Sequence, residues 1–299
     1  KSQFFTFIRT NFLKLLISSF KISMYSLKLA ISMIVKNCFR LLLGVGCLTI
    51  SLLSPAMARP EYQLQPPHQQ KQPLTSEQLR KLAQSTIVRV ISSENQFQRG
   101  GSGSLILRRG GRHYLLTSLH VVDHSGQYRI QTPDEKIYWA QVVATFSSPV
   151  RGDIALLRFN SLRSYPVLPV AVSLKGLVDE TTFACGFPIT DQLIQSERLY
   201  CNTGKMTVIL EEPLVGGYQL GYTNSIKKGM SGGPVLNQYG ALVGLNGLSQ
   251  LPLFANAYTF QDGRLASEEE ISILQELSWA IPTRTAIELF NQFRSQNPL

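Results

Sequence analysis

The stretch Lys228-Gly229-Met230-Ser231-Gly232-Gly233-Pro234 decides how this chain of 299 residues is interpreted. A serine stands between glycines, after a polar loop and before the strand-like run Val235-Leu236-Asn237. Glycines allow a sharp turn in which neighbouring N–H groups point toward one spot beside the serine hydroxyl. Two such donors can stabilise the oxyanion of an acyl-transfer intermediate, so the stretch predicts a nucleophilic serine.

A serine hydroxyl needs a base, and the base needs a group that orients it. His120 follows the apolar run that begins at Tyr114, which places its imidazole at a strand end rather than in the core. Asp153 opens the apolar run Ile154-Ala155-Leu156-Leu157, where a carboxylate must be paired because an unpaired buried charge is costly. Holding a histidine tautomer is such a pairing, so His120 and Asp153 are the candidate base and acid.

These residues lie in three blocks: Thr-Ser-Leu-His-Val-Val from Thr117, Gly-Asp-Ile-Ala-Leu-Leu from Gly152, and Gly-Met-Ser-Gly-Gly-Pro-Val from Gly229. In this order the blocks resemble the signatures of chymotrypsin-fold, or trypsin-like, serine proteases. The spacings of 33 residues from His120 to Asp153 and 78 from Asp153 to Ser231 are similar to those of the compact bacterial HtrA/Deg-like branch. The resemblance covers roughly residues 86–290, and it includes Gly101-Ser-Gly-Ser, Val243-Gly-Leu-Asn and Ala280-Ile-Pro.

The resemblance implies an all-β fold of two six-stranded antiparallel β-barrels, about 86–163 and 164–282, with a C-terminal helix at 283–295. It implies a serine endopeptidase whose catalytic triad is His120, Asp153 and Ser231. The backbone N–H groups of Gly229 and Ser231 would form the oxyanion hole. Protein or peptide substrates follow from this reading, without a cofactor.

The substrate pocket is predicted only from the resemblance. Ser225, six residues before the nucleophile, would lie at the base of the pocket, and Asn246 stands about where glutamyl endopeptidases use a histidine. Neither carries a charge, so a preference for small or medium apolar side chains is expected. Met230 replaces the aspartate that receives a freed N-terminus in digestive relatives, so activation by N-terminal insertion is not expected.

The positive charge of the chain is concentrated at its beginning. The formal net charge is +10, but residues 1–58 hold seven basic residues and no acidic one, which leaves +3 for the rest. Lys36 and Arg40 precede a largely apolar run, 41–53, and an Ala56-Met57-Ala58 ending. This pattern predicts a signal peptide cleaved after Ala58, hence export to the periplasm or beyond, with an uncleaved membrane anchor as the alternative. No basic stripe elsewhere indicates nucleic-acid binding.

The chain then divides into a spacer and a β-rich region. Residues 59–74 are rich in Gln and Pro and predict a flexible spacer, followed by a short helix opened by a capping box at Thr75–Gln78. From 86 onward short apolar runs bounded by turn residues predict many strands. These runs are 86–92, 102–108, 113–118, 127–131, 137–145, 153–159, 167–173, 181–186, 203–210, 217–223, 233–237, 241–246 and 255–260.

The remaining histidines and cysteines leave several alternatives open. His124 is the rival base, whereas His68 and His113 are expected to face solvent, and no Cys or Glu cluster completes a metal site around His124. Cys185 and Cys201 could form a disulfide in an exported protein or remain buried thiols.

Two rival functions are compatible with the same sequence. One is a secreted, catalytically inactive homologue that binds peptides, and the other is a membrane-anchored scaffold. HtrA-like proteases commonly carry a PDZ domain after this point, and the sequence up to Leu299 has no room for one. The chain is therefore expected to represent a form without that domain.

Overall fold

A computed structural model describes residues 72–92, 100–122, 127–145, 152–189, 196–250 and 258–297. All of these lie in the second of the two units into which the chain divides, Tyr62–Leu299. The predicted signal peptide, its cleavage site and the spacer up to residue 71 fall outside the described residues. In the described ranges, no helix has the length and apolar character needed to cross a bilayer.

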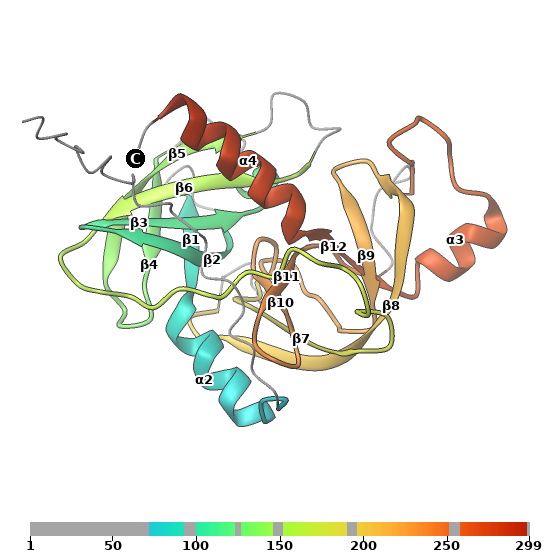
Figure 1. Cartoon of the computed structure of the whole chain (residues 1–299), viewed down its shortest axis with the longest axis horizontal. Helices are drawn as coiled ribbons and strands as arrows, with labels where there is room; N and C mark the ends of the chain where they lie inside the picture. The colour runs from blue at the N-terminus through green and yellow to red at the C-terminus, as the bar shows by residue number, and fades with distance from the viewer. Residues whose placement is uncertain are drawn as a thin grey trace, which may run out of the picture. The chain divides into compact units, whose positions relative to one another are not determined.

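The described strands form two closed antiparallel barrels of six strands each, which confirms the predicted fold (Figure 1). Barrel 1 consists of β1 (Ile87–Ser92), β2 (Gly100–Arg109), β3 (Arg112–Thr117), β4 (Tyr128–Gln131), β5 (Ile137–Thr145) and β6 (Ala155–Asn160). Barrel 2 consists of β7 (Thr181–Gly186), β8 (Tyr200–Leu214), β9 (Tyr218–Tyr222), β10 (Pro234–Asn237), β11 (Leu242–Leu248) and β12 (Ser278–Pro282).

Each barrel is filled by alternate side chains of its strands, as the two-residue repeat of a strand requires. Val88, Leu105 and Phe159 belong to the core of barrel 1, and Met206, Leu220 and Val235 to that of barrel 2. A third apolar cluster includes residues from both barrels and from the helices, such as Tyr114, Phe183 and Phe290. Burial of these side chains at about 25 cal/mol per Å² is the main driving force for this arrangement.

The helices α2 (Ser76–Thr86) and α4 (Thr283–Gln296) begin at the residues that the sequence predicts. Helix α2 starts at a complete capping box made by Thr75 and Gln78, and α3 (Glu268–Leu274) starts at another made by Ser267 and Glu270. The closing helix α4 follows β12 and packs on β5 of barrel 1 as well as on β11 and β12 (Figure 1). Helix α4 therefore links the two barrels.

One predicted strand is absent from the described structure, and one observed strand was not predicted. Residues 167–173 form no strand beyond a single bridge, Val170 to Leu242, and Pro166 and Pro169 interrupt the run. Conversely, the completely buried strand β12 is absent from the predicted runs, because its five residues show no polar–apolar alternation. The predicted run 255–260 lies partly outside the described residues, and its described end, Thr259 and Phe260, makes only isolated bridges.

Candidate active site

Barrel 1 brings His120 and Asp153 together at the ends of two paired strands. Thr117, the last residue of β3, pairs with Ala155, the first residue of β6. His120 follows β3 in a short 3₁₀ turn, η1 (Leu119–Val121), and Asp153 precedes β6. Because the two strands are antiparallel neighbours, the chain leaving β3 meets the chain entering β6.

Asp153 binds both the backbone and the ring of His120. Its Oδ1 accepts a hydrogen bond from the His120 N–H at 2.7 Å, and its Oδ2 pairs with His120 Nδ1. Its carbonyl oxygen also accepts from the Leu119 N–H at 3.1 Å. The Asp153 side chain is 13% exposed and that of His120 is 46% exposed, so the carboxylate is sheltered while the imidazole remains accessible. This arrangement orients the ring and can stabilise an imidazolium.

The N–H groups of Gly229 and Ser231 differ from those of the neighbouring residues Met230, Gly232 and Gly233. The Met230 N–H donates to Lys227 O, the Gly232 N–H to Asn246 O and the Gly233 N–H to Met230 O. In the part of the chain that the structure describes, the N–H groups of Gly229 and Ser231 donate to no other group. These are the two donors predicted for the oxyanion hole.

The conformation of this loop depends on its glycines. Gly229 has φ +89° and Gly232 has φ +80°, values in the left-handed region that favours glycine. A Cβ on Gly232 would lie 2.3 Å from Ser102 O and 2.4 Å from Thr117 Oγ1. The nucleophile loop therefore packs closely against β2 and the end of β3, which carry the barrel 1 half of the site.

Ser102 joins the two halves from the barrel 1 side, a role that the sequence does not predict. Its N–H donates to Ser231 O at 2.8 Å, and its buried hydroxyl donates to Gly229 O at 2.9 Å while accepting from the Phe187 N–H at 2.8 Å. Five small residues, 100–104, stand at the start of β2, before Leu105-Ile106-Leu107. That pattern is the only sequence signal for this close approach.

Tyr218 is a second residue that sequence reasoning missed. Its hydroxyl donates to Asp153 Oδ2 at 2.5 Å, although the two residues belong to different barrels. Burial, together with the nearby Asp153 charge, raises the pKa of Tyr218 well above its ordinary value. The phenol therefore stays protonated and acts as a donor.

The two predicted pocket residues, Ser225 and Asn246, differ in burial. Ser225 is exposed, and its carbonyl oxygen accepts from Asn202 Nδ2 at 2.8 Å. The prediction that Asn246 lines a substrate pocket requires correction, because this residue is completely buried. Its Nδ2 donates to Cys185 O at 3.0 Å and its Oδ1 accepts from the Tyr222 hydroxyl at 2.8 Å. Asn246 thus braces barrel 2 beneath the nucleophile loop.

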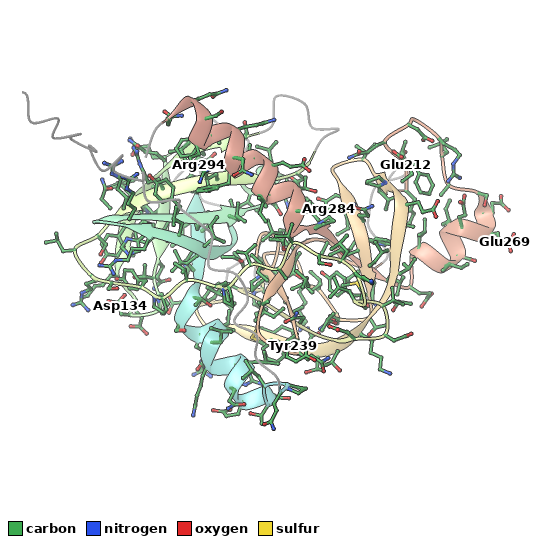
Figure 2. The ribbon with its side chains drawn as sticks, viewed as in Figure 1. Asp134, Glu212, Tyr239, Glu269, Arg284 and Arg294 are labelled. Carbon is green, nitrogen blue, oxygen red and sulfur yellow. A yellow bond between two sulfur atoms is a disulfide. The ribbon has the colours of Figure 1, made fainter. Side chains whose placement is uncertain are left out.

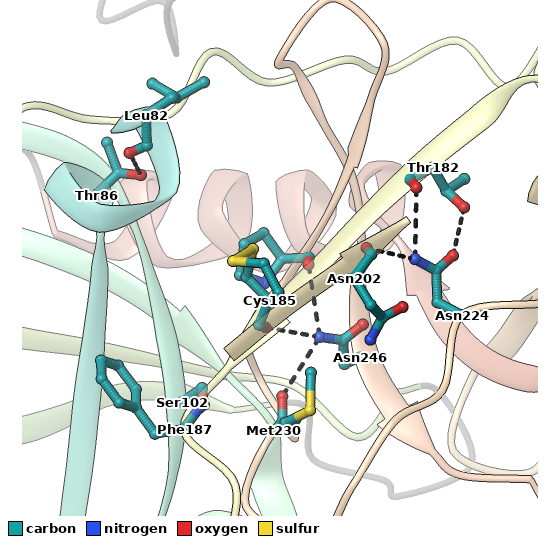
Figure 3. The surroundings of a disulfide bond; sticks show 12 residues. Leu82, Thr86, Ser102, Thr182, Cys185, Phe187, Asn202, Asn224, Met230 and Asn246 are labelled. Atoms are coloured by element: carbon teal, nitrogen blue, oxygen red, sulfur yellow. Dashed lines mark hydrogen bonds between the residues drawn. A yellow bond between two sulfur atoms is a disulfide. The ribbon is translucent and has the colours of Figure 1, made fainter. Parts of the chain in front are cut away.

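Met230 and the cysteines complete this foundation. Met230 is completely buried in the core of barrel 2, and its sulfur accepts from the Lys227 N–H at 3.4 Å, so it packs beneath the loop. Cys185 and Cys201 face each other on β7 and β8 and form a disulfide, which decides between the two alternatives (Figure 3).

The other histidines contribute nothing to the site in the described structure. The expectation that His113 faces solvent is wrong, because its side chain is completely buried in barrel 1 and stacks on Phe159. His68 and His124 lie outside the described residues. Among the residues that the structure describes, no group of three or more His, Cys, Asp or Glu side chains could hold a metal ion.

Comparison with known proteins adds to this geometry. The trypsin-like peptidase domain family matches residues 101–245. The chain is 27% identical over 149 residues to the serine endoprotease DegS of Salmonella typhimurium, which covers 50% of this chain and 39% of DegS. It is 30% identical over 158 residues to the serine protease HTRA1 of Xenopus laevis, covering 50% of this chain and 31% of HTRA1.

Two further similarities are to a DegP-like protein and to a solved structure. A probable periplasmic serine endoprotease, DegP-like, of Marinomonas is 28% identical over 195 residues, covering 65% of this chain and 35% of that protein. The crystal structure of a serine endoprotease from Yersinia pestis has a TM-score of 0.55 at 22% identity, covering 74% of this chain and 67% of that one. The matched regions thus span well under half the length of DegS, HTRA1 and the DegP-like protein.

Proposed function

We propose that this chain, which belongs to the HtrA-like branch of the chymotrypsin-fold serine proteases, is an endopeptidase that cleaves peptide bonds through an acyl-enzyme at Ser231. His120 would remove the proton from the Ser231 hydroxyl and return it to the leaving amine. Asp153 would hold the tautomer of His120 and stabilise the imidazolium. Water would then release the acyl group by the same route in reverse.

The observation that carries this proposal is that the acid–base pair and the oxyanion donors are both already formed. Asp153 already binds His120 through both carboxylate oxygens. Among the residues that the structure describes, the N–H groups of Gly229 and Ser231 have no acceptor, and they are the donors that would bind the oxyanion. Donors that are fixed before the reaction need no rearrangement when the charge appears, which makes this term large in acyl transfer.

The substrate class and the location are proposed from the family and from the sequence. Protein or peptide substrates follow from the protease family. Ser225 carries no charge, so we expect poor cleavage after Lys and Arg. The signal-like leader and the name of the DegP-like relative support export, with Arg59 as the mature N-terminus. N-terminal sequencing of the exported protein tests this, and an intact leader recovered in membranes would favour the anchored alternative.

The catalytic proposal is tested by cleavage of casein with the purified full chain and its Ser231→Ala variant. Loss of the nucleophile from such a triad lowers kcat by about 10⁶-fold. The control is Ser173→Ala, which changes an exposed serine and should retain full activity. Full activity of Ser231→Ala would refute the triad, whereas a folded but inactive wild-type protein would favour the peptide-binding homologue.

A further inference from the structure

Tyr218 contacts the acid of the triad from the opposite barrel. It is the first residue of β9 and only 5% exposed, and its hydroxyl donates to Asp153 Oδ2 at 2.5 Å. The same oxygen pairs with His120 Nδ1, while Oδ1 accepts from the His120 N–H. Both carboxylate oxygens are therefore engaged, and Oδ2 is shared between the imidazole and the phenol.

Two glycines make the room for the Tyr218 ring. A Cβ on Gly247 would lie 1.9 Å from Tyr218 Cε1, and a Cβ on Gly216 would lie 2.7 Å from Cε2. Because each distance is far below van der Waals contact, a side chain at either position would displace the ring. The ring lies between the β8–β9 turn and the end of β11, with its hydroxyl on Asp153.

The turn that carries this tyrosine also holds the backbone of Asp153. The Asp153 N–H donates to Gly216 O at 2.7 Å. Two backbone hydrogen bonds to the segment after β11 hold this turn. The Val215 N–H donates to Thr259 O at 2.7 Å, and the Gln261 N–H donates to Pro213 O at 2.8 Å. Tyr218 is therefore presented by a braced turn.

We propose that Tyr218 is a positioning residue of the triad, which sets the orientation and the charge of Asp153 and thereby the proton affinity of His120. The proposal rests on the function proposed above. A hydrogen bond from a neutral donor to a carboxylate withdraws charge from that oxygen without neutralising it. Removal of the donor leaves more negative charge facing the imidazole, so the imidazole holds its proton to higher pH. It also frees the carboxylate to rotate, which lowers the rate at every pH.

The test measures the rate at which a fluorophosphonate labels Ser231 as a function of pH, with the full chain. Tyr218→Phe keeps the ring between the two glycines and removes only the hydroxyl. We expect the acidic limb of the rate profile to move to higher pH by roughly 0.5–1 unit, and the plateau to fall about tenfold. A fluorotyrosine introduced at position 218 keeps the fold and strengthens the donor, so its limb should move to lower pH than that of the wild type.

The matched control is Tyr222→Phe, which removes a buried hydroxyl on the same strand that donates to Asn246 Oδ1 instead of Asp153. It should lose a comparable amount of stability while its acidic limb stays in place. If neither Tyr218 substitution moves the limb, although Ser231 is labelled, the positioning role is refuted and the triad stands. If the wild-type protein is not labelled at Ser231, both the triad and the role of Tyr218 are refuted.

Discussion

Barrel 1 and barrel 2 have the same number of strands but place their buried polar groups differently. Barrel 1 buries Ser102 and Thr117 against the nucleophile loop and holds a separate polar cluster around the partly buried Asp134, which accepts from Thr132 at 2.6 Å and from Tyr165 at 3.0 Å and lies on the left side of Figure 2. In barrel 2, Asn246 lies beneath the nucleophile loop and donates to Cys185 O (Figure 3). It also accepts from the Tyr222 hydroxyl.

This difference separates two uses of buried polar groups. The Asp134 network joins Thr132, Tyr165 and Arg163, whereas Asn246 of barrel 2 donates to Met230 O at 3.5 Å, next to the Ser231 N–H that would bind the oxyanion. A change in the interior of barrel 2 should therefore affect both stability and activity. A change in the Asp134 network should affect stability alone. Substitutions in the two barrels test whether stability and activity separate in this way. The pair with the largest expected effect comes first.

Two aspartates of barrel 1 give the strongest contrast. Asp153→Asn should lower kcat on the order of 10⁴-fold, because an amide favours the wrong tautomer of His120. Asp134→Asn removes a carboxylate that is also held by Arg163 at 2.9 Å, and it should lower stability while kcat per folded molecule stays unchanged. Casein cleavage normalised to the folded fraction measures both. Equal losses of kcat in the two variants would contradict the separation.

Two glycines with the same backbone conformation separate packing from strain. Gly232→Ala places a Cβ 2.3 Å from Ser102 O at φ +80°, whereas Gly176→Ala has nothing within 4 Å at φ +78°. The backbone conformation alone costs about 1–2 kcal/mol, and the clash with rigid backbone should add several more. Urea unfolding should therefore show a much larger loss for Gly232→Ala, together with loss of activity. Similar unfolding midpoints would mean that the contact between the nucleophile loop and β2 is loose.

The disulfide should add to the unfolding free energy through barrel 2. Cys185 and Cys201 are 16 residues apart in sequence, so the bridge should contribute about 3 kcal/mol by restricting the unfolded chain. The double variant Cys185→Ala, Cys201→Ala should lose about that much in urea unfolding. It should also lose part of its activity, because without the bridge β7 can shift and with it Cys185 O, which accepts from Asn246. Reduced wild-type protein serves as the control. A double variant with wild-type stability would show that the disulfide does not stabilise barrel 2.

The smallest effect concerns the pH dependence of barrel 1. The side chain of His113 is completely buried, and this burial, assisted by the charge of Arg108, lowers the pKa of His113. The unfolded chain takes up this proton below about pH 6.5, whereas the folded chain does so only at lower pH. Stability from this site is thus complete above about pH 6.5 and is lost as the pH falls toward the lowered value.

The variant His113→Phe removes that titration while it retains a ring that can stack on Phe159. The difference in unfolding free energy between about pH 8 and about pH 5 should be smaller in this variant than in the wild type. The activity profile of the folded enzyme should keep its shape, because His113 lies outside the site. An unchanged pH dependence of stability would show that His113 is not protonated on unfolding in this range.

The sequence predicted those parts of the site that depend on local chemistry. A glycine-rich turn around Ser231 and the strand ends at His120 and Asp153 are readable because residue type and position in a strand restrict what each can do. The disulfide remained open, because only the register of β7 and β8 decides whether two cysteines face each other.

The sequence did not reveal contacts that depend on how the barrels meet. Tyr218 occurs in an ordinary strand pattern, and its role requires the turn at Gly216 and the space above Gly247. The strand β12 was missed because a short strand buried on both sides shows no alternation. Asn246 was assigned to a pocket by resemblance alone, and only its burial shows that it faces the interior.

The central claim is that the two barrels supply two halves of one catalytic site. The most direct test is covalent labelling of the full chain with a fluorophosphonate, located by peptide mass mapping, in the wild type and in His120→Ala. The account predicts one label on Ser231 in the wild type and a labelling rate lower by several orders of magnitude in His120→Ala, because the base lies on barrel 1 and the nucleophile on barrel 2. Labelling of Ser231 at an unchanged rate in His120→Ala, or labelling of a different residue, would contradict it.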